Sequence, residues 1–179
     1  MRKLFWGMFF LFFNINIFLF IINITLFPDF IGYILMALGV KELLNLSKHF
    51  KHIYPITIAM LILSAVFFVI SLFMIEIDMM LSGIISIAFS AMFLFLLCKI
   101  IFGIKDMEKN DDRDYKTSML FISWIVLTVF TGITYLSVLV SFLPFFTYLI
   151  TSLSIATGVV FIIFMIAFFI SKKEYESYR

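Results

Sequence analysis

Long uncharged runs alternate with short charged stretches along this chain of 179 residues. The first run, Leu4–Phe27, has 24 residues, and as a helix of about 36 Å it exceeds the roughly 30 Å hydrocarbon core of a bilayer. Thr117–Ser171 holds 55 uncharged residues, and Pro144 is expected to divide this run because proline starts helices well and interrupts them. The pattern predicts an all-α integral membrane protein, a six-helix transmembrane bundle with spans at about 4–27, 28–46, 54–75, 79–102, 117–141 and 144–170.

The second segment is short, since only Phe30–Val40 is uncharged between Asp29 and Lys41, and on length alone it could be re-entrant. The basic residues favour a crossing. If it crosses and the N-terminus is cytoplasmic, all 13 basic residues fall on the cytoplasmic side, as the positive-inside rule expects. These are Arg2, Lys3, Lys41, Lys48, Lys51, Lys99, Lys105, Lys109, Arg113, Lys116, Lys172, Lys173 and Arg179. We therefore expect three hairpins with both termini cytoplasmic.

Composition agrees with a membrane protein and leaves no room for a sizeable soluble domain. Hydrophobic residues make up 64% of the chain and charged residues 13%, against roughly 45–50% and 25% in soluble domains. We expect residues 1–179 to form a single transmembrane domain, whose first helix is retained because no small-residue cleavage site follows its basic start. Cys98 is the single cysteine, which suits a reduced cytosolic setting.

Small residues recur at helical spacing on three of the predicted spans. Such faces let helix backbones approach closely in lipid, either within one chain or against another membrane protein. The positions expected to pack helices are Gly32 and Gly39 on span two, Ser82, Ser86 and Ser90 on span four, and Ser154 and Gly158 on span six.

Polar residues inside the spans allow two interpretations. Asn16 and Asn23 are seven residues apart and point the same way from span one, so both amides should face the bundle interior. They could join helices, or line a solute site with Asp29 and with Thr128 and Thr131 of the hydroxyl-rich span five. Asp29 also has a local explanation, because a carboxylate in the first turn after Pro28 meets the helix dipole favourably.

Enzyme signatures are missing from the sequence: it has no nucleophile motif, metalloprotease motif or phosphate-binding glycine loop. His49 and His52 are three apart between lysines, which favours a basic interfacial linker over a metal site. Lys105–Lys116, "KDMEKNDDRDYK", is expected to be a solvated loop or a helical extension of span four. We expect no catalytic activity, cofactor, metal or nucleic-acid partner.

Two stretches carry a resemblance: "FWGMFFLFFNINI" at 5–17 and "FPDFIGYILMALGVKEL" at 27–43. With their Trp-Gly, Asn-x-Asn-Ile and Pro-Asp-Phe-Ile-Gly-Tyr motifs, they resemble a group of small multi-span membrane proteins of low-GC Firmicutes whose function is not established. The resemblance implies a bacterial plasma membrane. By size and span count the chain is also similar to the substrate-binding subunits of energy-coupling-factor vitamin transporters, although its first helix lacks their Ala-x-x-x-Ala face.

The leading hypothesis is a non-enzymatic accessory or interaction subunit, in contact with the lipid bilayer and with another membrane protein. Its basis is the short outer loops, the close-packing faces and the missing catalytic set. The alternative is a small-solute binding or transport subunit, whose site would lie between spans one, two and five. In that case Asn16, Asn23, Asp29, Thr128 and Thr131 would line it.

Overall fold

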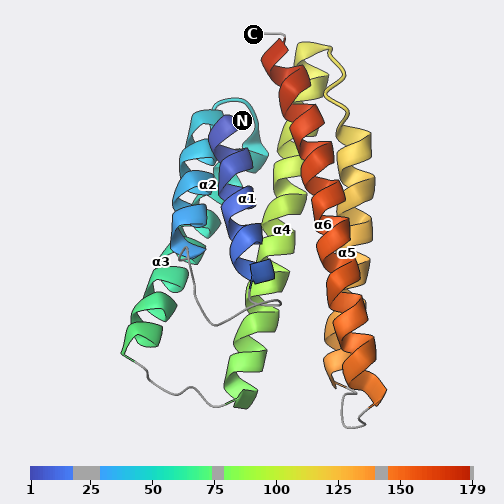
Figure 1. The fold of residues 1–179 in the computed structure, drawn as a ribbon. Coiled ribbons are helices and arrows are strands. Elements are labelled where there is room, and N and C mark those ends of the chain that lie inside the picture. The colour runs from blue at the N-terminus through green and yellow to red at the C-terminus, as the bar shows by residue number, and fades with distance from the viewer. Residues whose placement is uncertain (18–28, 74–78, 140–144, 178–179) are drawn as a thin grey trace.

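The computed structural model describes residues 1–17, 29–73, 79–139 and 145–177, and within these every regular element is an α-helix (Figure 1). The predicted all-helical class is therefore confirmed. Six helices follow one another along the described chain: α1 Arg2–Ile17, α2 Asp29–Leu43, α3 Lys48–Leu72, α4 Met79–Asp111, α5 Thr117–Leu139 and α6 Phe145–Ser177.

Successive helices run in opposite directions, so that both chain ends lie at the same end of the bundle (Figure 1). The connections at 44–47, between α2 and α3, and at 112–116, between α4 and α5, lie there as well. We call this the terminal end. It gathers most of the charged stretches that the sequence assigns to the cytoplasm.

Four of the described helices are long and apolar enough to cross a membrane: 48–70, 83–111, 117–137 and 148–177. The described parts of α1 and α2 have 16 and 15 residues, about 24 and 22 Å of helix. The structure therefore supports a membrane protein with four crossing helices. The two further crossings depend on the sequence argument.

Three helices extend beyond the predicted spans at the terminal end. α4 continues to Asp111 because Ile100, Ile104 and Met107 prolong its buried face past Lys99, at helical spacing. α6 likewise continues to Ser177. α3 begins at Lys48, not near Tyr54, and the segment expected as a basic linker is its first turn. Of the two alternatives for Lys105–Lys116, the helical extension of span four is observed as far as Asp111, and residues 112–116 form the connection to α5.

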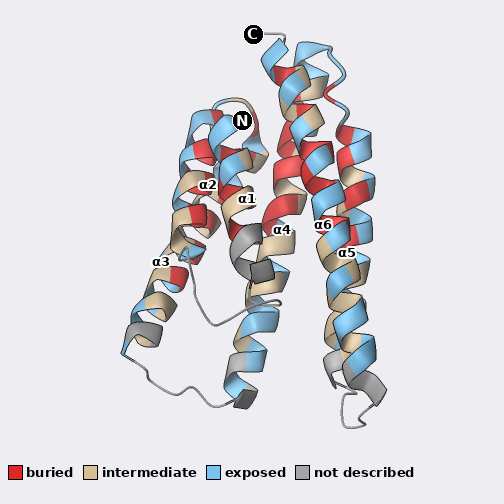
Figure 2. Ribbon diagram, in the orientation of Figure 1, coloured by how far each residue is buried: buried red, intermediate tan, exposed pale blue. Residues whose placement is uncertain are grey.

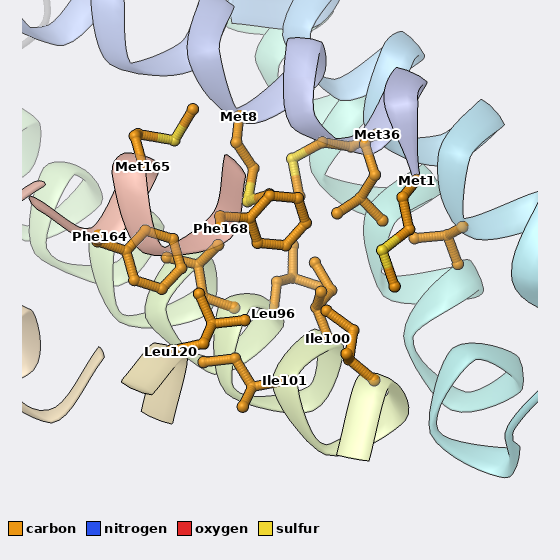
Figure 3. Packing of buried hydrophobic residues seen from close by; sticks show 14 of the residues in the cluster. Met1, Met8, Met36, Leu96, Ile100, Ile101, Leu120, Phe164, Met165 and Phe168 are labelled. Carbon is orange, nitrogen blue, oxygen red and sulfur yellow. The ribbon is translucent and has the colours of Figure 1, made fainter. Parts of the chain in front are cut away.

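The hydrophobic core lies toward the terminal end (Figure 2). Figure 3 shows Met8 of α1 and Met36 of α2 pointing toward Leu96 and Ile100 of α4 and Phe168 of α6. The opposite halves of α4, α5 and α6 are mostly exposed or half-buried (Figure 2). Apolar side chains at such positions suit contact with lipid tails or with a partner helix.

Candidate functional site: polar contacts and close helix packing

The closest helix contact described is between α1 and α2, and three glycines make it possible. A Cβ added to Gly7 would lie 2.6 Å from the backbone nitrogen of Met36, and one added to Gly39 would lie 2.6 Å from the backbone nitrogen of Leu4. A Cβ on Gly32 would lie 2.5 Å from Cγ of Leu11. Real Cβ atoms do not approach so closely, so this packing requires glycine.

Gly32 and Gly39 were expected to pack helices, and the structure places both against α1. The sequence analysis did not predict a packing role for Gly7, because a single glycine in an aromatic-rich run shows no spacing pattern.

An ion pair joins α1 to α2 at the terminal end, where Lys3 Nζ lies 2.6 Å from a Glu42 carboxylate oxygen. Both side chains are about half exposed, so this pair adds little stability.

The hydroxyls of α5 bond mainly to their own helix. Thr128 Oγ1 donates to the Trp124 carbonyl at 2.9 Å, Thr134 Oγ1 to the Phe130 carbonyl at 2.9 Å, and Ser137 Oγ to the Ile133 carbonyl at 2.8 Å. Thr131, between them, is half-buried. Bonding back to the preceding turn satisfies a hydroxyl without any solute.

Further polar contacts join α5 to its neighbours. The Trp124 indole Nε1 donates to the Leu94 carbonyl of α4 at 3.0 Å. The Tyr135 hydroxyl forms a short hydrogen bond with Ser90 of α4. Thr134 Oγ1 lies 3.1 Å from Thr157 Oγ1 of α6. The sequence analysis did not predict roles for Trp124 and Tyr135, because it considered only small, amide and hydroxyl residues within the spans.

The remaining small residues have varied surroundings. Ser86 is exposed, and its carbonyl lies 3.5 Å from the Tyr135 hydroxyl. Ser154 and Gly158 are half-buried on α6. The Ser82 side chain lies outside the described residues, so its packing stays a prediction.

The residues of the solute hypothesis are not brought together by the described helices. Among the described residues α5 packs against α4 and α6, and neither α1 nor α2 touches it. Asp29 is exposed at the start of α2. Asn23, and the side chain of Asn16, lie outside the described residues. The site between spans one, two and five therefore stays a prediction.

A polar cluster at the terminal end links α3 to α4. Ser47 Oγ accepts a hydrogen bond from the backbone N–H of His49 at 3.1 Å, which caps the start of α3. The same hydroxyl donates to a carboxylate oxygen of Asp106 at 2.5 Å, and His49 Nε2 lies 3.8 Å from that oxygen. The ring of Phe102 lies beside His49, with centroids 5.7 Å apart. Asp106 therefore joins α4 to the residue that caps α3, and the sequence analysis did not predict this contact.

Tyr115 is buried in the α4–α5 connection and contacts α6. Its hydroxyl donates to Asp111 at 2.7 Å, and its ring centroid lies 5.7 Å from that of Tyr175. Burial, followed by the hydrogen bond to Asp111, raises the pKa of Tyr115 to about 12. The side chain therefore stays neutral at physiological pH and ties the connection to the end of α6.

Within the described ranges, no group of three His, Cys, Asp or Glu side chains could hold a metal ion. His49 and Asp106 form only a pair, and His52 is exposed. Comparisons with protein-family models, with curated protein sequences and with solved structures give no match.

Proposed function

We propose that this protein is a six-span protein of a bacterial plasma membrane, with its terminal end in the cytoplasm, and that it acts as a non-enzymatic accessory or interaction subunit. One observation carries the proposal. Thr128, Trp124 and Ser90, which lie within the apolar helices, bond to their own backbone or to a neighbouring helix. A solute pathway would need such groups free to meet the solute.

The outer surface of α4 and α5 supports an interaction role. Gly83 and Gly132 are exposed, and a Cβ added to either would meet nothing within 4 Å. Large apolar side chains flank them, including Ile84 and Ile133. An exposed glycine between large apolar residues gives another transmembrane helix a place to approach closely.

Photo-crosslinking in membranes tests the interaction role. A photoreactive residue would replace exposed Ile84 or Ile133, and buried Met60 would provide the control position. The expected result is one recurring protein adduct from the exposed positions, identified by mass spectrometry, and none from position 60. Adducts with lipid alone from both exposed positions would contradict the proposal.

Thermal-shift screening against metal ions, vitamins and other small solutes tests the competing class. A ligand that binds only the folded state must raise its melting temperature. We expect no solute to stabilise the protein. A clear shift with one small solute, abolished by Asn16→Ala and Asn23→Ala, would favour a binding subunit instead.

A further inference from the structure

A pocket of about 460 Å³ lies between the end of α4 and the start of α5. It is a separate feature from the helix contacts above and does not depend on the interaction role. One helix supplies Ile101, Phe102, Lys105 and Glu108, and the other supplies Thr117, Ser118, Phe121 and Ile122. Its lining is thus polar in one part and apolar in the other.

The polar part offers a cation and two hydroxyls. Thr117 is only 2% exposed, yet its Oγ1 has no hydrogen-bond partner among the described residues. The Thr117 Oγ1 atom is covered by protein, so the hydroxyl that a ligand in the pocket can reach is that of Ser118, which is exposed. Lys105 is exposed and forms no ion pair with any described residue. Its neighbour Asp106 is engaged elsewhere, with Ser47.

The apolar part faces the membrane side of the pocket. Phe102 and Phe121 contact each other, with ring centroids 5.9 Å apart, and Ile122 is 62% exposed beside them. Thr117 begins α5, and Lys105 lies about one turn beyond the predicted inner end of span four. The boundary between headgroups and acyl chains would therefore pass through the pocket.

We propose that this pocket binds a phospholipid of the cytoplasmic leaflet. Lys105 and the hydroxyl of Ser118 hold the headgroup phosphate, and an acyl chain lies along Phe121 and Ile122. A charged donor near a phosphate gives a strong hydrogen bond.

The carboxylate of Glu108 gives the pocket a preference among phospholipid headgroups. It lies three residues from Lys105 on the same face of α4 and also lines the pocket. One cation and one anion complement a zwitterionic headgroup, whose phosphate meets Lys105 while its ammonium meets Glu108. The ligand is therefore phosphatidylethanolamine in preference to phosphatidylglycerol, whose headgroup has no cation for Glu108.

Native mass spectrometry of the purified full-length chain with added phosphatidylethanolamine or phosphatidylglycerol tests the proposal. We expect a bound phosphatidylethanolamine, weakened about tenfold by Lys105→Ala, as for loss of a hydrogen bond to a charged group. Ser118→Ala should weaken it as well, because it removes the hydroxyl that bonds the phosphate. Lys109→Ala is the matched control, since Lys109 is exposed on the same helix and does not line the pocket.

Glu108→Gln should shift the preference toward phosphatidylglycerol. Glycerophosphoethanolamine, which lacks acyl chains, should not bind detectably, because the apolar contacts are then lost. Equal lipid binding by Lys105→Ala and Lys109→Ala would overturn the proposal. So would a preference for phosphatidylglycerol in the wild-type protein. The melting temperature of each variant without lipid verifies that it is folded.

Discussion

The backbone of Gly39 on α2 lies directly against the backbone of Leu4 on α1. A Cβ at position 39 would come within 2.6 Å of the Leu4 nitrogen and 2.8 Å of its Cα. Both of these are backbone atoms, so the neighbour cannot yield by changing a rotamer. The two helices would have to separate to admit even one methyl group.

Gly39→Ala should therefore destabilise the protein, by about 1–3 kcal/mol as for other overpacked sites. Gly132→Ala is the matched control because nothing lies within 4 Å of the added Cβ and alanine favours a helix. Thermal unfolding in detergent measures both. Equal melting temperatures for the two variants would contradict the proposed close contact.

Ser47→Ala should remove the cap of α3 and the bond to Asp106 together. Loss of a helix cap costs about 1 kcal/mol, and the carboxylate at Asp106 loses a donor. Ser152→Ala is the control, since that exposed hydroxyl donates only to the Tyr148 carbonyl of its own helix. A double-mutant cycle with Asp106→Asn should show coupling between positions 47 and 106. Strictly additive losses would indicate that the bond contributes nothing.

Trp124→Phe should weaken the contact between α4 and α5. It removes the indole donor to the Leu94 carbonyl, and interhelical hydrogen bonds in membranes are worth about 0.6–2 kcal/mol. Trp6→Phe serves for comparison, because Trp6 is exposed and phenylalanine can keep its ring contacts. The difference between the two melting temperatures is the test. A larger loss at position 6 would argue against the α4–α5 bond.

The raised pKa of Tyr115 predicts that the stability of the fold decreases at high pH. Its folded-state pKa is raised from 10.0 to about 12, so the folded state holds the proton more tightly than the unfolded state does. The resulting stability is present below pH 10 and is lost as the pH rises toward 12. Subtracting the phenolate absorbance titration of Tyr115→Phe from that of the wild type gives the titration of Tyr115. A difference curve centred near pH 10 would show that Tyr115 is solvated.

Cysteine labelling tests the topology. In a Cys98→Ser background, a cysteine at Glu76 should react with an impermeant maleimide from outside the cell, because that position is predicted to be external. A cysteine at the exposed Lys109, at the terminal end, should react only after the membrane is opened. Labelling of position 76 from the cytoplasm alone would exclude the six-span arrangement.

Sequence and structure agree most closely on the class of the protein and on where its helices fall. Uncharged runs as long as a bilayer is thick permit little besides a helix, because every backbone group must be bonded within the segment. α5 begins in the structure at Thr117, the first residue of the predicted fifth span. Prediction of these features required no knowledge of distant contacts.

The tertiary structure alone decided which helices meet and what their polar groups do. Gly7 has a packing role because the backbone of Met36 lies against it. Asp106 has a structural role because it accepts a hydrogen bond from Ser47. These outcomes depend on contacts between residues far apart in the chain, and such contacts leave no periodic signal in a single sequence.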